Sequence, residues 1–367
     1  MNKQRQSNFE LLRVFAMLLI VFHHVDLIIP VWPRDLNFYQ MFLINFFGDF
    51  GKVGVNLFVL ITGYFMCNKK IRTKNVVRIW IETVFYGWLT LCVGLLIGHS
   101  FQLKSLLSFI FPVLFSLRWF ATAYLIVYLF IPFLNPIIKT NKAKNILFLF
   151  FILLFVLSIM PTIRLNPGYS DVGWLIFVYL LGGFFAKYSV DINRFFSARF
   201  TFISSFIVFF LIICVLYLSL ILGKNISIFK AIPDYLMIQN SSFLSLIFSI
   251  LIFFIFLRIK IQSNFINFVA SLMFGIYLFH APVLEFLISK YVNLSNLSNN
   301  GIFLILYLVL SPIIVFCFFG FIEFLRIKFL GNLFFLVIGK IAAKIDLYIE
   351  IIGKKIDLKM ENNEQSI

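Results

Sequence analysis

Residues 10–31 read ELLRVFAMLLIVFHHVDLIIPV, a mostly apolar stretch with few polar side chains. A helix that crosses a bilayer needs about 20 predominantly apolar residues, so this stretch predicts a transmembrane helix. Basic residues precede it, but the run is longer than the apolar part of a signal peptide and no small-residue cleavage site follows. We therefore expect the first helix to be retained.

The rest of the chain has the same character. Of its 367 residues, 62% are hydrophobic and 13% are charged, which excludes an ordinary water-soluble fold. The sequence predicts an all-α fold, a polytopic membrane helical bundle of about ten transmembrane helices. The ten apolar windows are 10–31, 48–67, 77–99, 118–138, 145–161, 171–188, 199–222, 241–260, 264–289 and 301–325.

Two further segments are interpreted differently. The apolar stretch 103–116 directly precedes Arg118 and is expected to be interfacial or re-entrant. Residues 329–359 alternate apolar runs with lysines, which favours a basic amphipathic helix on the membrane surface. We therefore expect a membrane domain over residues 1–330 and a cytoplasmic tail over 331–367.

The basic residues are distributed unevenly between the two sides of this layout. With the N-terminus inside, 23 of the 31 Lys and Arg residues fall on the cytoplasmic side and eight outside. This asymmetry follows the positive-inside rule and predicts a multi-pass protein of the cell membrane with both termini in the cytoplasm. The net charge of +16 is thus attributed to the basic residues that orient the protein in the membrane, and no nucleic-acid partner is expected.

Polar residues inside the predicted spans are candidates for function because they are costly in lipid. They are Arg13, His23, His24, Asp26, Glu82, His99, His280, Glu285 and Glu323. Local ion pairs are the alternative for two of them: Glu82 lies four residues after Arg78, and Glu323 lies beside Arg326 at an expected helix end. His280 precedes Pro282, where a kink is expected, and fits a hydrogen bond within the bundle as well as a substrate contact.

Arg13 and His24 share one face of the first helix. They are eleven residues apart, which at ~100° per residue places them within about 20° of the same direction and ~16 Å apart along the axis. Arg13 would then bind an anionic ligand near the cytoplasm, with His24 as a base at depth in the same cavity. Alternatively, Arg13 reaches the interface and pairs with Glu10, and the two histidines donate hydrogen bonds to neighbouring helices.

Other chemistries lack support in this sequence. The four cysteines are far apart without CxxC spacing, and no nucleotide-binding, zinc-protease or hydrolase motif occurs. We therefore predict no metal site and no bound cofactor.

Five segments, in order, resemble the membrane acyltransferase-3 family: NFELLRVFAMLLIVFHHV (8–25), GVNLFVLITGYF (54–65), RWFATAYLIVYLFIPFLNP (118–136), FVYLLGGFF (177–185) and SLMFGIYLFHAPV (271–283). Arg13 and His24 fit the family's spacing of an Arg, ten residues and a His. Thr62 stands where the family usually has Ser. The stretch KNVVRIW (74–80) has Arg78 as the second Arg of the family's RxxR, but Asn75 in place of the first.

The resemblance implies an integral-membrane O-acyltransferase that moves an acyl group, usually acetyl, from cytoplasmic acyl-CoA to a carbohydrate. It implies a stand-alone form without the esterase-like domain of some members. We assign the catalytic roles to His24, as base, and Arg13. Acyl-CoA, the co-substrate, is expected at Arg13, Arg72, Lys74 and Arg78, and the carbohydrate acceptor at Trp119, Tyr124 and His280.

Two other classes of function remain open at this point. An exporter or flippase for a glycan or its lipid-linked precursor would also suit ten spans with few buried charges. A membrane assembly partner is the third possibility. The sequence identifies neither the acceptor, nor the acyl group, nor the oligomeric state.

Overall fold

A computed structural model of the protein describes residues 5–33, 35–164, 170–223, 239, 241–292, 294 and 300–364. Four positions counted in the charge asymmetry, Lys3, Arg34, Lys224 and Lys230, lie outside the described residues. Every regular element in the described part is helical, which confirms the predicted all-α class.

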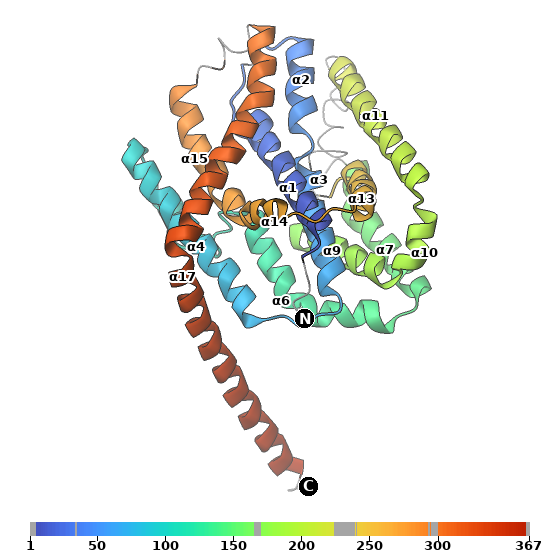
Figure 1. Ribbon diagram of the computed structural model, residues 1–367, viewed down its shortest axis with the longest axis vertical. Helices are drawn as coiled ribbons and strands as arrows, with labels where there is room; N and C mark the ends of the chain where they lie inside the picture. Colours follow the sequence, from blue (N-terminus) through green and yellow to red (C-terminus); the bar gives the residue numbers. More distant parts are fainter. Residues whose placement is uncertain are drawn as a thin grey trace.

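The helices are drawn in Figure 1. Their bounds are α1 (Ser7–Phe22), η1 (His23–Ile28), α2 (Phe38–Gly48), α3 (Gly51–Met66), α4 (Thr73–Ile97), α5 (Leu103–Ile110), α6 (Trp119–Thr140), α7 (Ala143–Leu154), η2 (Phe155–Ile159), α8 (Met160–Arg164), α9 (Asp171–Lys187), α10 (Ser189–Phe195), α11 (Ala198–Leu222), α13 (Phe243–Arg258), α14 (Asn264–Ser271), α15 (Met273–Tyr291) and α17 (Gly301–Glu364).

Several of these helices can cross a membrane, and the protein is a multi-pass membrane protein. Seven helical segments in the described part are long and apolar enough, and the count is eight if α14 and α15, which are bent by 44°, form one span. All ten predicted windows fall on helices, but α9 and α13 have only 17 and 16 residues. The expected count of about ten spans therefore stays a prediction.

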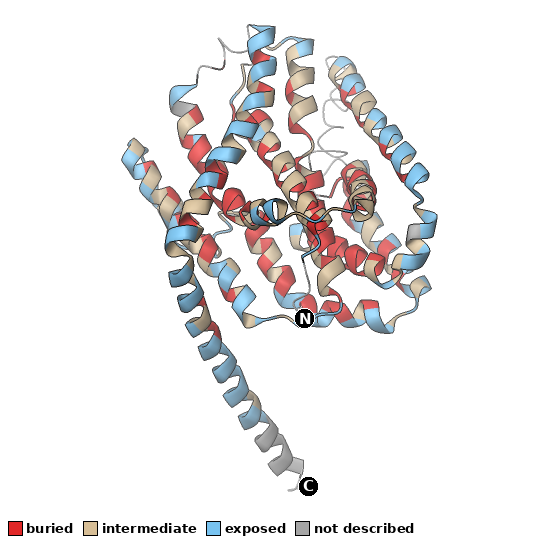
Figure 2. Cartoon of the chain, in the orientation of Figure 1, coloured by how far each residue is buried: buried red, intermediate tan, exposed pale blue. Residues whose placement is uncertain are grey.

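The centre of the bundle is formed by α1, α3 and α9, whose ribbons carry much of the buried surface in Figure 2. Small residues allow these helices to approach closely. A Cβ at Gly63 would overlap the Tyr179 carbonyl, one at Gly182 would overlap the Leu60 carbonyl, and one at Gly54 would overlap the backbone of Ala16. Close backbone contact through small residues is a common way for helices to associate in lipid.

The last helix departs from the expected domain boundary. α17 runs through residue 330 without a break and continues to Glu364, and its lower part extends away from the bundle in Figure 1. Beyond 330 it still contacts α4: Ile338 and Ala342 pack on Val77, and the Thr73 hydroxyl donates a hydrogen bond to Asp346. The boundary at 330 thus divides one continuous helix.

The expected re-entrant stretch contains the short helix α5, which lies against α4. The Trp88 Nε1–H donates to the Ile110 carbonyl at 2.9 Å.

The break in the ninth predicted span lies at a different place from the one expected. α15 continues through Pro282, and the chain bends between α14 and α15, near Leu272.

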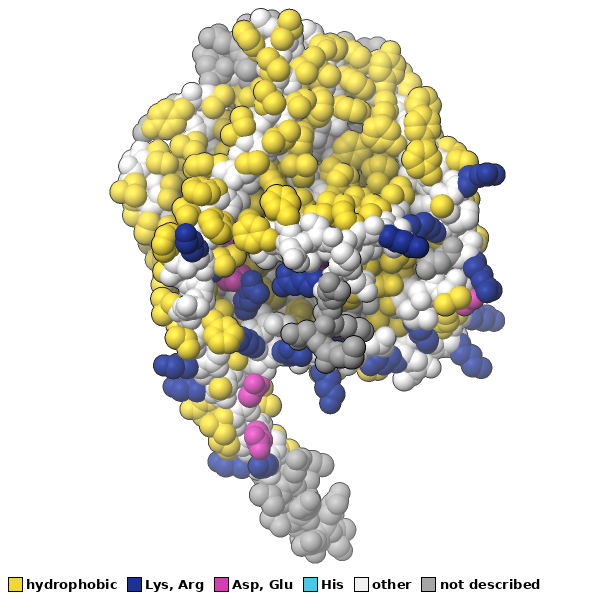
Figure 3. Space-filling view, viewed as in Figure 1, with side chains coloured by type: hydrophobic (Ala, Val, Ile, Leu, Met, Phe, Trp, Pro, Cys, Tyr) yellow, Lys and Arg dark blue, Asp and Glu magenta, His cyan; other side chains and the backbone are white. Residues whose placement is uncertain are grey.

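The outer surface separates into two zones on the face shown in Figure 3. Hydrophobic side chains cover most of the upper half, while Lys and Arg side chains gather over the lower half. A surface of this kind fits a bundle whose upper part lies in hydrocarbon and whose basic part faces an aqueous compartment.

Candidate functional site

A cavity of about 450 Å³ lies between α1, α3, α4, α6 and the α14–α15 pair. Its walls combine charged groups at one end with aromatic rings at the other. The lining includes the cations Arg5, Arg13 and Arg78, the acids Glu10 and Glu82, the polar residues Thr62, Asn75, Tyr124 and Tyr128, and the aromatic residues Phe58, Phe120 and Tyr277.

Two of the arginines in this cavity are paired with acids of their own helix. Arg13 Nη1 lies 2.6 Å from Glu10 Oε1, so the alternative pairing considered for Arg13 is present. Arg78 Nε lies 3.0 Å from Glu82 Oε1, which confirms the predicted local pair. Both arginines line the cavity while paired, so an anionic ligand would enter a site whose cations are already oriented.

The other two predicted donor-binding residues lie elsewhere. Arg72 is an exposed residue at the start of α4, and Lys74 places its Nζ 3.5 Å from the centre of the Phe335 ring on α17. Neither lines the cavity. Asn75, which stands in place of the first Arg of RxxR and was not predicted to bind the donor, does line it and donates from Nδ2 to the Tyr128 hydroxyl at 2.9 Å.

Tyr124, one of the predicted acceptor-binding residues, lines the same cavity. Its hydroxyl shares a hydrogen bond of 3.0 Å with the hydroxyl of Thr62. Thr62 also donates to the Phe58 carbonyl at 2.9 Å, so the Tyr124 hydroxyl supplies the donor in the shared bond. Thr62 therefore holds this phenol group in a fixed direction at the cavity wall.

A buried ionic network supports one side of the cavity. Arg326 on α17 forms two hydrogen bonds of 2.6 Å with Glu323 and lies 3.5 Å from Glu82, and the Tyr86 hydroxyl donates to Glu323. Glu323 is only 2% exposed and lies inside α17, so the expectation of a helix-end residue is wrong, although its pairing with Arg326 is present. The network joins α17 to α4.

His24 and His280 meet in the interior of the bundle. His24 Nδ1 lies 2.8 Å from His280 Nε2, although the residues are 256 positions apart in the chain. His24 belongs to η1, a stretch of π-helix in which the Ile29 amide donates to the His24 carbonyl. Such π-helical turns inside α-helices are rare and often occur at functional sites.

The hydrogen bonds fix the proton positions when both imidazoles are neutral. His280 Nδ1 lies 2.7 Å from the Ile276 carbonyl, which can only accept, so Nδ1 carries the hydrogen. His280 Nε2 then accepts, and His24 Nδ1–H donates to it. The remaining nitrogen of His24, Nε2, keeps its lone pair and is available to accept a proton.

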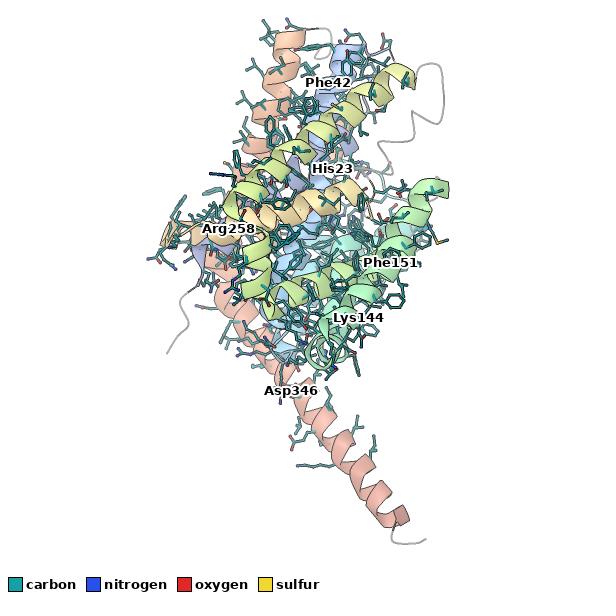
Figure 4. All side chains as sticks on the ribbon, turned by 90° about the vertical axis from the view of Figure 1, so that its right-hand side faces the viewer. His23, Phe42, Lys144, Phe151, Arg258 and Asp346 are labelled. Carbon is teal, nitrogen blue, oxygen red and sulfur yellow. The ribbon has the colours of Figure 1, made fainter. Side chains whose placement is uncertain are left out.

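His23 is placed differently from its neighbour. Its Nδ1 donates to the Gly48 carbonyl at 2.6 Å, and a Cβ at Gly51 would overlap its ring. Figure 4 shows His23 among the inner helices, whereas Phe151 and Lys144 lie on another part of the bundle. The carboxylate of Asp26, three residues further along, is buried and has no hydrogen bond to His23 or to any other residue in the described part of the chain.

Arg13 and His24 do not line one common cavity as expected. The cavity around Arg13 is bounded by Tyr277 and Phe120, and His24 is not among its lining residues. Tyr277 is three residues before His280 on α15, so the aromatic end of the cavity adjoins the histidine pair. Trp119, also outside the lining, has its ring 4.9 Å from Lys52 Nζ.

No group of three or more His, Cys, Asp or Glu residues in the described part of the chain is arranged to hold a metal ion.

Comparison with known proteins gives one result for the whole chain. A family model described as an acyltransferase domain, that of the acyltransferase-3 family, matches residues 6–348. The matched range includes the cavity lining apart from Arg5, the histidine pair, and α17 as far as its contacts with α4. No curated protein and no solved structure matched the chain.

Proposed function

Because the chain belongs to the acyltransferase-3 family, it is a membrane acyltransferase, and we propose that it uses cytoplasmic acetyl-CoA to acetylate a hydroxyl of a cell-surface carbohydrate or its precursor. One arrangement carries this proposal. A cavity with three arginines at one end has aromatic walls that adjoin a histidine with a free ring nitrogen.

The arginine end suits the donor. Coenzyme A carries several phosphate charges, and guanidinium groups bind phosphate through paired, directed hydrogen bonds. Arg13 and Arg78 already face the cavity, and Arg5 adds a third cation. The donor phosphates would replace Glu10 and Glu82 as partners of these arginines. The aromatic end then receives the uncharged arm that carries the acetyl thioester.

The histidine end suits the transfer. The acceptor hydroxyl attacks the thioester carbonyl while His24 Nε2 takes the hydroxyl proton, which leaves a negative oxygen on the former carbonyl. When this intermediate collapses, the carbon–sulfur bond breaks and the proton passes to the leaving thiolate. The products are the acetyl ester and free CoA thiol. His280 holds the His24 ring in the required tautomer and orientation.

We propose an orientation of the protein in the membrane from the position of its basic surface. The end of the protein rich in Lys and Arg faces the cytoplasm, and so both termini lie there. This places Arg13 near the source of acetyl-CoA and the histidine pair deeper in the membrane, toward the acceptor.

The proposal is tested with membranes that contain either the wild-type protein or the His24→Gln variant. Both are supplied with acetyl-CoA labelled in the acetyl group, and alkali-labile label in the glycan fraction is measured. We expect wild-type membranes alone to transfer label. If the label stays on CoA with both proteins while glycan export still depends on the gene, the protein is a transporter and the proposal is wrong.

A further inference from the structure

Lys52 is a cation close to the histidine pair with an unused ammonium group. It lies in the first turn of α3, and its Nζ is 4.9 Å from the centre of the Trp119 ring. It forms no hydrogen bond and no ion pair with any described residue, although Asp171 is within electrostatic range. The contact with Trp119 orients the amine and leaves its three N–H donors free.

Arg118 is a second cation at this place, on the residue before α6. Its Nε donates to the Leu278 carbonyl and its Nη1 to the Leu117 carbonyl, each at 3.0 Å. Nη2 is buried and has no partner in the described part of the chain. Glu285 and Tyr277 are its electrostatic neighbours. Two fixed hydrogen bonds hold the guanidinium while its third nitrogen remains unused.

Printed contacts aside from charge place both cations beside the histidine pair: Arg118 donates to the carbonyl of Leu278, two residues before His280, and Lys52 lies over Trp119, the residue after Arg118. Both cations also lie within electrostatic range of the His24 ring. Arg118 is also within range of His280. Leaving a donor buried and unpaired costs about 1–3 kcal/mol in general, and more for a charged group. The buried Nη2 of Arg118 bears this cost, and together with the Lys52 ammonium beside the same general base it indicates a partner that is present only during the reaction.

Resting on the function proposed above, we infer that Lys52 Nζ and Arg118 Nη2 donate hydrogen bonds to the negative oxygen that forms on the acyl carbonyl during transfer. Attack by the hydroxyl moves the carbonyl electron pair onto this oxygen, as the hydroxyl proton moves to His24. When the carbonyl re-forms, the electron pair returns and the thiolate leaves. Lys52 and Arg118 are thus catalytic residues that gain and lose no proton.

The charges in the site are consistent with this role. Asp171 lies within electrostatic range of Lys52 and Glu285 within range of Arg118, but neither cation forms a close ion pair with a described residue. During transfer, the new positive charge on His24 and the new negative charge on the oxygen arise together. Donors already oriented toward that oxygen need little rearrangement, which is what makes such groups effective in catalysis.

The test measures kcat for acetyl transfer and Kd for acetyl-CoA in purified Lys52→Gln and Lys52→Met proteins. Removal of one donor to such an oxygen generally lowers kcat about 10²–10³-fold, so we expect that loss with Kd for acetyl-CoA unchanged within about twofold. Lys52→Arg, which retains a charged donor, should recover much of the activity. Lys328→Gln is the matched control, because Lys328 also lies over an aromatic ring, Phe329, but does not line the cavity and is not among the charges near His24.

Three results would overturn the assignment. If Lys52→Gln keeps kcat within about threefold of wild type while His24→Gln is inactive, Lys52 does not act on the reacting oxygen, although the proposed function stands. If both Lys52→Gln and Lys52→Met lose acetyl-CoA binding together with kcat, Lys52 is structural. If the wild-type protein transfers no acetyl group, the proposed function fails and this inference fails with it.

Discussion

The cations at the two ends of the site are held in different ways. At the cavity end, Arg13 and Arg78 form close ion pairs with Glu10 and Glu82. At the histidine end, Lys52 has no ion pair within the described residues, and Arg118 is held by backbone carbonyls with one nitrogen unused. The first pair of cations has charged partners in the resting protein, and the second pair does not.

This difference assigns ligand binding to one end of the site and chemistry to the other. A ligand that binds at the arginine end must replace the carboxylates of Glu10 and Glu82. Its binding free energy is therefore the difference between the ion pairs it forms with the arginines and the ion pairs it breaks. The donors at the histidine end have no carboxylate partner to give up. They are available to a charge that exists only during the reaction. Changes at the first end should therefore alter donor binding, and changes at the second should alter turnover.

The largest effect is expected from His24→Gln. Glutamine keeps a similar size but cannot take a proton at neutral pH, so kcat for acetyl transfer should fall by at least about 10²–10⁴-fold, the usual contribution of a general base. His23→Gln should keep substantial activity, because His23 donates to Gly48 and packs on Gly51. Loss of activity in His23→Gln with an active His24→Gln would assign the base to the other histidine.

A smaller effect is expected from His280→Leu. The change removes the acceptor for His24 Nδ1–H and frees the His24 ring to turn, and a small misplacement of a catalytic group can lower kcat about 10²-fold. His280→Gln should recover part of the activity, because its side-chain carbonyl can accept the same hydrogen bond. Equal activity in His280→Leu and wild type would show that the histidine pair has no positioning role.

Arg13→Lys should act mainly on the donor. The ammonium group keeps the charge but lacks the planar, paired donors that match a phosphate, so we expect KM for acetyl-CoA to rise about tenfold or more and overall activity to fall. Steady-state rates over a range of acetyl-CoA concentrations measure this. An unchanged KM would leave Arg13 as a residue that only reaches the interface and pairs with Glu10.

The smallest effect is expected from Glu10→Gln, and its direction is opposite. The Arg13–Glu10 pair is partly exposed, with 29% of the Arg13 side chain accessible, so it contributes only about 0.2–1 kcal/mol. Removing the competing carboxylate should make acetyl-CoA binding up to about fivefold tighter, measured as Kd by titration calorimetry. Weaker binding in this variant would mean that Glu10 orients Arg13 for the donor instead of competing with it.

Features set by local sequence were predicted well. Each apolar window became a helix because about 20 consecutive apolar residues leave the backbone no other way to satisfy its hydrogen bonds in lipid. The Arg78–Glu82 pair follows from a spacing of four residues on one helix. Arg13 and His24 were selected from their spacing and from the resemblance, and the structure places Arg13 in the cavity and His24 in the adjoining pair.

Features that depend on distant contacts could not be predicted. Nothing near His24 in the sequence shows that its partner is His280, and no local signal indicates the π-helical turn at His23–Ile28. Lys52, two residues before the GVNLF motif, has no local signal that selects it, because its position near Trp119 and His24 depends on contacts with other helices. Lys74 was predicted to bind the donor, and its contact with Phe335 on α17 could not be expected from residues near it in the sequence.

The division between the two ends of the site is tested most directly by the Kd of acetyl-CoA for two purified variants, Arg13→Ala and His24→Gln, measured side by side with wild type by titration calorimetry. We expect His24→Gln to bind within about twofold of wild type, and Arg13→Ala to bind more than about tenfold more weakly, because it loses a charged partner of the donor phosphates. The reverse result, with weak binding in His24→Gln and normal binding in Arg13→Ala, would contradict the account.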